Sequence, residues 1–151
     1  MKRFLITLFG SFFYTGFFPI APATFACMVW LLVWLFVPGG GYLTHPLALV
    51  VTVPFAIWFA FVMEGYYGKD ASKIVIDEVV GMQVTLFMIQ PDWKVGVAGF
   101  FLFRFFDIAK PFPVGRAERL RGGYGVVIDD FLAGIYSFIA LYLLMRFTSL
   151  I

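Results

Sequence analysis

The chain has 151 residues, of which 62% are hydrophobic, 21% aromatic and only 13% charged, and its formal net charge is +2. Soluble domains contain roughly 25% charged residues, so this chain is too apolar for one. The composition excludes a disordered chain and disfavours a soluble nucleic-acid-binding protein. It predicts one all-α domain, residues 1–151, embedded in a lipid bilayer.

Apolar segments separated by short linkers predict a small polytopic protein with about five membrane helices. The segments cover residues 23–37, 46–63, 74–89, 94–108 and 126–147. Some are shorter than the roughly 20 residues that span an average bilayer. A further apolar stretch, 4–18, is cut off by Pro19 and Pro22. It predicts an N-terminal helix that lies in the membrane interface or re-enters the membrane.

The distribution of Lys and Arg in the linkers predicts the orientation. Linkers 38–45 and 90–93 contain neither residue, whereas the start of the chain, 64–73 and 109–125 contain at least two each. Positively charged loops stay in the cytoplasm, so the alternation predicts a cytoplasmic N-terminus, an external C-terminus and five crossings.

Acidic residues gather at the predicted cytoplasmic ends of the helices. Five of them lie within apolar sequence: Asp77, Glu78, Asp107, Asp129 and Asp130. A charge in such a place costs about 3 kcal/mol or more unless it is paired or hydrated. We therefore expect the five carboxylates to share one polar site and to bind Mg²⁺, which prefers oxygen ligands. The alternative is that they pair with neighbouring Lys and Arg residues, or mark helix starts, where the helix dipole favours acids.

Two of the acidic runs are similar to each other. They are IVIDEVVG, residues 74–81, and VVIDDFLAG, residues 126–134. Gly81 follows Asp77 by one helical turn, and Gly134 follows Asp130 in the same way. Small residues allow helices to approach closely, so these glycines predict a helix crossing that brings the carboxylates together.

Basic residues near the end of the fourth predicted helix form a candidate phosphate site. Arg104, Asp107 and Lys110 follow one another at intervals of three residues, roughly on one helix face. Three more arginines follow in the next loop: Arg116, Arg119 and Arg121. Arginine donors suit phosphate oxygens. The alternative is an ordinary cytoplasmic loop with the positive charge that such loops carry.

The other reactive residue types narrow the chemistry. The single histidine, His45, is predicted to lie outside, and the single cysteine, Cys27, lacks the C-x₅-R context of cysteine phosphatases. The sequence contains no P-loop motif. Metal-assisted hydrolysis and attack by an Asp carboxylate remain. Thr24 is predicted to cap a helix, and as the alternative to contact a phosphate or a metal-bound water.

Three sequence blocks together resemble a known family. They are FFPIAPATFA (17–26), DASKIVIDEVVGM (70–82), and FRFFDIAKPFPV with GGYGVVIDDFLAG (103–114 and 122–134). Their order and spacing resemble those of phosphatidylglycerophosphatase A, a family of bacterial Mg²⁺-dependent membrane lipid phosphatases. Ala23 departs from the glycine that this family usually has. The resemblance implies hydrolysis of the anionic phospholipid phosphatidylglycerophosphate at the cytoplasmic face of the inner membrane.

The resemblance also implies roles for individual residues. It implies catalytic positions at Thr24 and the five carboxylates, with the carboxylates as Mg²⁺ ligands. Lys110 is the expected phosphate-binding residue, and we add Arg104 and Arg116 to it. A CDP-alcohol phosphotransferase would also use membrane carboxylates, but its DGxxAR…GxxxDxxxD signature is absent. A transporter would place charges at mid-bilayer, and a small structural subunit would not need five buried acids.

Overall fold

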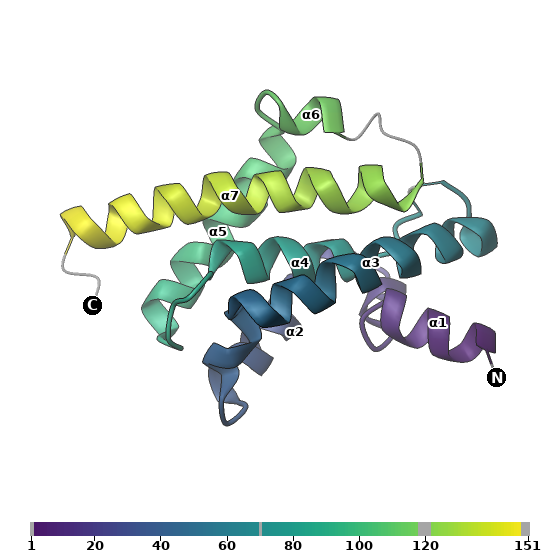
Figure 1. Cartoon of the computed structure of the whole chain (residues 1–151), viewed down its shortest axis with the longest axis horizontal. Helices are drawn as coiled ribbons and strands as arrows, with labels where there is room; N and C mark the ends of the chain where they lie inside the picture. Colours follow the sequence, from purple (N-terminus) through teal and green to yellow (C-terminus); the bar gives the residue numbers. More distant parts are fainter. Residues whose placement is uncertain (1, 70, 118–121, 149–151) are drawn as a thin grey trace.

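The computed structural model describes residues 2–69, 71–117 and 122–148 (Figure 1). The elements in chain order are α1 (Lys2–Gly10), η1 (Thr15–Phe17), α2 (Pro22–Phe36), η2 (Gly40–Thr44), α3 (Pro46–Tyr67), α4 (Ile76–Thr85), α5 (Trp93–Ala109), α6 (Val114–Ala117) and α7 (Gly123–Phe147). These described ranges contain helices and no β-strand. The prediction of an all-α fold is therefore confirmed.

Each of the five predicted segments corresponds to one helix, α2, α3, α4, α5 or α7. Local chemistry explains several of the boundaries. Pro22 and Pro46 occupy the first turns of α2 and α3, where the missing N–H of proline leaves no helical bond unmade. Asp92 caps α5, because its carboxylate accepts hydrogen bonds from the backbone N–H groups of Lys94 at 2.8 Å and Val95 at 3.1 Å.

Two of the described helices are long and apolar enough to cross a bilayer. They are α3, with 22 residues, and α7, with 25 residues. At about 1.5 Å per residue they measure about 33 and 38 Å, against an apolar bilayer core of about 30 Å. Helix α2 is apolar but shorter, with 15 residues. The expectation of five crossings is thus not confirmed.

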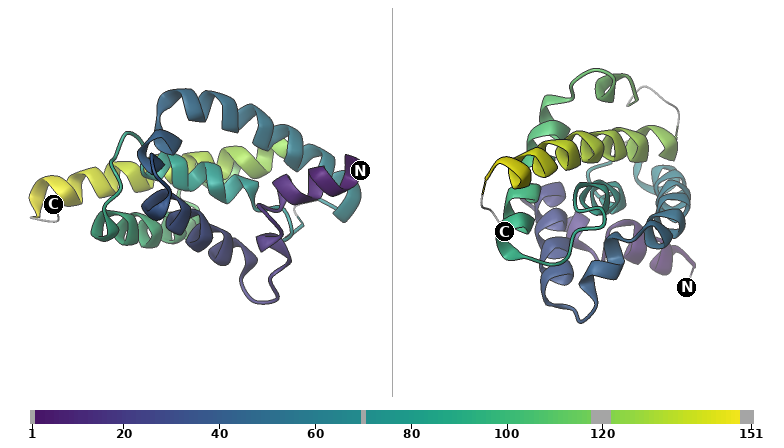
Figure 2. Two further views of the ribbon diagram at one scale, coloured as in Figure 1. Left: turned by 90° about the horizontal axis from the view of Figure 1, so that it is seen from below. Right: turned by 60° about the vertical axis from the view of Figure 1, so that its left-hand side comes forward.

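Helix α4 occupies the centre of the molecule. It is only 10 residues long, and every residue from Asp77 to Thr85 is buried. Helices α2, α3, α5 and α7 pack around it, and the right-hand view of Figure 2 shows it near the middle of the bundle. A helix of about 15 Å cannot span the bilayer, so α4 is enclosed by protein instead.

Glycines set the close contact between α4 and α7. A Cβ atom added at Gly134 would lie 2.6 Å from the carbonyl oxygen of Gly81, and one added at Gly81 would overlap the Phe103 ring. Only glycine fits at either position without a shift of its neighbours. The prediction that these glycines allow the helices to approach closely is confirmed.

The N-terminal stretch folds back on the rest of the molecule. Helix α1 packs against α3, and Gly10 lies against the side chain of Met63. The carbonyl of Gly10 also accepts a hydrogen bond from the backbone N–H of Val75 at 3.2 Å, just before α4. Whether this stretch lies in the interface or re-enters the membrane stays a prediction.

Candidate active site

One cavity brings together six of the nine side chains predicted to form the site. Its volume is about 260 Å³, and it lies where the start of α4, the end of α5 and the first turns of α7 meet. The residues that line it are Asp77, Glu78, Asp107, Ile108, Lys110, Val126, Asp129 and Asp130. The shared polar site expected for the five carboxylates is therefore present.

Different elements supply the carboxylates. Asp77 and Glu78 lie in the first turn of α4, where the helix dipole favours negative charge. Asp129 and Asp130 lie further into their helix, because α7 begins at Gly123, three residues before the predicted start at Val126. The dipole effect falls off within the first turn. A role as helix-start residues therefore does not explain the second pair.

Three carboxylates form the innermost part of the cavity, and we call Asp77, Glu78 and Asp130 the inner carboxylates. They are almost completely buried, and one oxygen of each lies within 4.8 Å of an oxygen of the other two. Each also has a buried oxygen that accepts no hydrogen bond within the described part of the chain: Asp77 Oδ1, Glu78 Oε2 and Asp130 Oδ2.

This arrangement fits a divalent cation. Buried carboxylate oxygens without partners are costly, and several like charges at this distance repel one another. A cation among the three oxygens would offset both costs, and Mg²⁺ prefers oxygen ligands of this kind. The inner carboxylates are thus suited to hold Mg²⁺.

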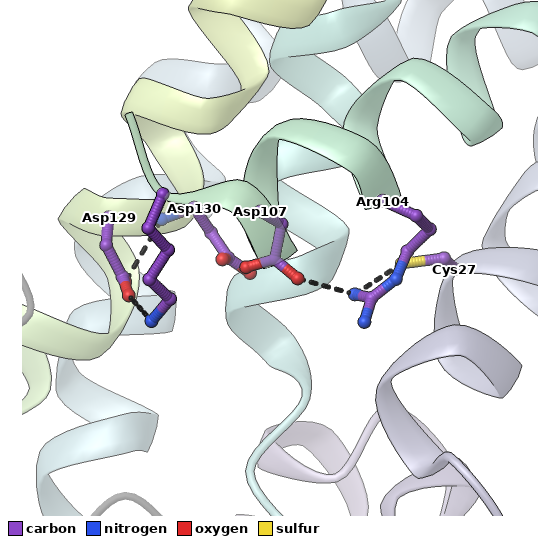
Figure 3. Close-up of polar contacts among 6 residues, drawn as sticks. Cys27, Arg104, Asp107, Asp129 and Asp130 are labelled. Atoms are coloured by element: carbon purple, nitrogen blue, oxygen red, sulfur yellow. Dashed lines mark hydrogen bonds and ion pairs between the residues drawn. The ribbon is translucent and has the colours of Figure 1, made fainter. Parts of the chain in front are cut away.

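The other two acids of the cavity are each bound to a cation, and we call Asp107 and Asp129 the paired aspartates (Figure 3). A guanidinium nitrogen of Arg104 lies 2.9 Å from Asp107 Oδ2. The ammonium of Lys110 lies 3.0 Å from Asp129 Oδ2. For these two residues the alternative prediction, pairing with a neighbouring cation, is confirmed.

Lys110 reaches the cavity through an unusual backbone conformation. It ends α5 with φ of 42° and ψ of 57°, in the left-handed region. The residue before a proline is disfavoured in the right-handed helical region, so Pro111 prevents α5 from continuing. The side chain lines the cavity and binds Asp129.

Arg104 lies behind the cavity rather than in its lining. The nitrogen that binds Asp107 also lies 4.0 Å from the sulfur of Cys27, a completely buried residue of α2. This contact could not be predicted from a local pattern, because Cys27 and Arg104 are 77 residues apart. Ile108 and Val126 were also not predicted as lining residues, although each lies within one helical turn of a predicted carboxylate.

Two other predicted site residues lie elsewhere. Helix α2 begins at Pro22 with Ala21 as its N-cap, so Thr24 is already inside the first turn and the capping prediction is wrong. Thr24 is not among the residues that line the cavity. Arg116 is exposed on α6, with its guanidinium 4.8 Å from the centre of the Phe112 ring. Arg119 and Arg121 lie outside the described residues.

One family model and several known proteins match this chain. The family model described as Phosphatidylglycerophosphatase A matches residues 8–145. A protein of Bacteroides thetaiotaomicron named "Putative phosphatidylinositol-3-phosphatase" is 44% identical over 151 residues, covering 92% of this chain and 94% of the relative.

Two relatives carry the family's own name. Phosphatidylglycerophosphatase A of Escherichia coli is 31% identical over 132 residues, covering 85% of this chain and 74% of the relative. The Haemophilus influenzae protein of that name is 47% identical over 75 residues, covering 48% of this chain and 46% of the relative. No solved structure matches the chain.

Proposed function

Because the chain belongs to the phosphatidylglycerophosphatase A family and is therefore a phosphatase, we propose that it hydrolyses the terminal phosphate monoester of phosphatidylglycerophosphate. The products are phosphatidylglycerol and inorganic phosphate. The observation that carries the proposal is the cavity of about 260 Å³, which presents five carboxylates and one lysine in an otherwise apolar helical protein.

The inner carboxylates are the proposed Mg²⁺ ligands. Their unpartnered buried oxygens and mutual distances support this assignment. When bound, Mg²⁺ supplies a Lewis acid that polarises the phosphoryl oxygen and activates water. Attack by an Asp carboxylate is the alternative route to the same products.

Lys110 is the proposed phosphate-binding residue. Its ammonium is already inside the cavity, held by Asp129 at 3.0 Å. A phosphate that enters the cavity meets this positive charge next to the inner carboxylates, and a charge-assisted hydrogen bond would orient it. Asp129 acts in this scheme by keeping the ammonium in place between turnovers.

The proposed setting is the bacterial inner membrane, crossed by α3 and α7, with the cavity facing the cytoplasm. The N-terminus, the end of α3 and the start of α7 lie at one end of the molecule (Figure 1). Lys2, Arg3 and Lys69 are exposed at this end, which supports a cytoplasmic assignment. In a Cys27→Ala background, a cysteine at His45 should react with an impermeant reagent in intact cells, whereas one at Arg116 should not. The reverse pattern would contradict the orientation.

A second candidate substrate is phosphatidylinositol 3-phosphate, which the name of the Bacteroides relative favours. Both lipids carry a phosphate monoester on the headgroup of a glycerophospholipid, so the same carboxylates and lysine serve either one. The two candidates differ in the alcohol that leaves, a glycerol hydroxyl or an inositol hydroxyl.

The deciding experiment measures phosphate release by the purified protein in detergent. Both lipids are offered at equal surface concentration, with Mg²⁺ or with a chelator, and Asp130→Asn serves as the inactive control. We expect a higher kcat/KM for phosphatidylglycerophosphate and loss of activity with the chelator. A higher kcat/KM for the inositol lipid would replace the proposed substrate. Full activity in the chelator would remove the proposed role of Mg²⁺.

A further inference from the structure

We propose that Arg104 is a positioning residue that acts through Asp107, and that it does not bind the substrate phosphate. This inference rests on the proposed function, because Asp107 lies beside the inner carboxylates that are assigned there to Mg²⁺. It replaces the role that the sequence predicted for Arg104. The observation behind it is a row of contacts from α2 to the cavity.

The row begins at Cys27 and ends at Asp130. One guanidinium nitrogen of Arg104 contacts both Cys27 Sγ, at 4.0 Å, and Asp107 Oδ2, at 2.9 Å. Figure 3 shows Asp107 between Arg104 and Asp130, with an oxygen of Asp107 next to the carboxylate of Asp130. Asp107 therefore has Arg104 on one side and an inner carboxylate on the other.

Arg104 fixes the direction of the Asp107 carboxylate. Two neighbouring carboxylates repel each other, so Asp107 would turn away from Asp130 if nothing held it. The ion pair with Arg104 binds Oδ2 and leaves the other oxygen directed at the inner carboxylates. Both side chains of the pair are only 15% exposed, so water screens this interaction weakly.

The position of Arg104 does not suit direct phosphate binding. Asp107 and Lys110 line the cavity and Arg104 does not. To reach a phosphate there, the guanidinium would have to leave Asp107 and Cys27 and pass the Asp107 side chain. Lys110 needs no such movement.

The first test measures cation binding without substrate. Binding of Mn²⁺ to the purified protein in detergent is followed by electron paramagnetic resonance. We expect Arg104→Gln to weaken Mn²⁺ binding about tenfold, the effect of losing one charge-assisted hydrogen bond. Arg104→Lys should restore part of the loss, because it keeps the charge beside Asp107. Arg146→Gln, at the exposed end of α7, is the matched control and should bind Mn²⁺ like the wild type.

The second test uses kinetics on phosphatidylglycerophosphate. For Arg104→Gln the Mg²⁺ concentration that gives half-maximal activity should rise about tenfold, whereas the lipid KM at saturating Mg²⁺ should change less than about threefold. In an Asp107→Asn background, Arg104→Gln should add almost nothing, because the two residues act as one unit. Size-exclusion profiles show whether each variant is folded. If Arg104→Gln does not fold, Arg104→Lys and Cys27→Ala are measured in its place. We expect both to raise the Mg²⁺ concentration for half-maximal activity, by less than about tenfold.

The results separate this inference from the proposed function. An increase in lipid KM with unchanged Mn²⁺ binding would show that Arg104 binds phosphate, and would overturn the inference while the enzyme remains a lipid phosphatase. Additive effects of Arg104→Gln and Asp107→Asn would overturn it as well. If the wild type released phosphate from neither lipid, the proposed function would fail, yet weaker Mn²⁺ binding by Arg104→Gln would still support the inference.

Discussion

Carboxylates lie on both sides of the cavity, but their partners differ between the two sides. Where α4 crosses α7, the inner carboxylates each have a buried oxygen without a hydrogen-bond partner within the described ranges. Where the end of α5 meets α7, the paired aspartates are each bound to a cation within about 3 Å. The similar runs 74–81 and 126–134 even contribute to both groups, since Asp77 is an inner carboxylate and its counterpart Asp129 is paired. The helices that pack around each carboxylate, and not the sequence next to it, therefore determine whether it is paired with a cation.

This difference implies two kinds of mutational effect. Removal of an inner carboxylate takes away a proposed cation ligand and also removes a repulsive charge. Removal of a paired aspartate takes away one ion pair of Lys110 or of Arg104. The following changes test that distinction.

The largest effect is expected from Asp130→Asn. We expect phosphate release to fall by about 100-fold or more, because even residues that only support metal ligands cost 10–100-fold when they are removed. In the presence of a chelator, however, the variant should unfold at the same temperature as the wild type or a higher one, since one of three repelling carboxylates is gone. Activity in a Mg²⁺ titration and thermal unfolding in detergent measure the two results. Near wild-type activity would make the inner carboxylates structural.

Lys110→Ala should have the next largest effect. Loss of a charge-assisted contact worth about 1.5–3 kcal/mol corresponds to a roughly 10- to 100-fold lower kcat/KM. Mn²⁺ binding should remain, because Lys110 is paired with Asp129, whereas the carboxylate that lies beside Asp130 in Figure 3 is that of Asp107. Asp129→Asn should change kcat/KM in the same direction, since it removes the ion pair that holds the ammonium in the cavity. We expect Asp130→Asn to abolish Mn²⁺ binding. If Lys110→Ala abolished it as well, the distinction between inner carboxylates and paired aspartates would be wrong.

Gly134→Ala tests the contact that assembles the inner carboxylates. The added methyl group would lie 2.6 Å from the carbonyl oxygen of Gly81, so α4 and α7 must separate. We expect a loss of about 1–3 kcal/mol in stability, typical of overpacking, together with weaker Mn²⁺ binding. Gly65→Ala in α3 is the matched control, because a Cβ there meets nothing within 4 Å. If both variants unfold alike, the glycine contact does not set the geometry of the cavity.

Arg116→Ala should have the smallest effect, less than about threefold on kcat/KM, because an exposed cation contributes little. Its guanidinium rests on the Phe112 ring and does not line the cavity. A kinetic comparison with Lys110→Ala measures the difference. A larger effect for Arg116→Ala would restore the role that the sequence predicted for it.

Much of the fold could be predicted, because the signals were local. Apolar runs bounded by Pro, Gly and charged residues placed the helices, and the prediction for the last one missed only the three residues before Val126. The central position of α4 could not be predicted. Its sequence, IDEVVGMQVT, mixes apolar residues with two acids and a glutamine, and only the packing of four other helices around it shows that these polar residues are buried as well.

The same limit applies to the site. The acids could be predicted as a group because charges are rare in such an apolar chain. Their division into inner and paired carboxylates depends on which cation lies close in space. The spacing of Arg104, Asp107 and Lys110 is compatible with all three facing one phosphate, and it does not reveal Cys27 on the far side of Arg104. Thr24 does not cap α2 because the helix already begins at Pro22, so that Ala21 and not Thr24 occupies the N-cap position.

The enclosed position of α4 also bears on how the protein is made. A helix of 10 residues that begins with Asp77 and Glu78 is too short and too acidic to enter a bilayer alone. Helices α3 and α7 are long enough to insert independently, and α7 is synthesised after α4. Helix α4 is then buried only when the inserted helices associate around it. In the proposed membrane setting, a nascent chain that lacks α7 would leave Asp77 and Glu78 without the helix that packs most extensively against α4.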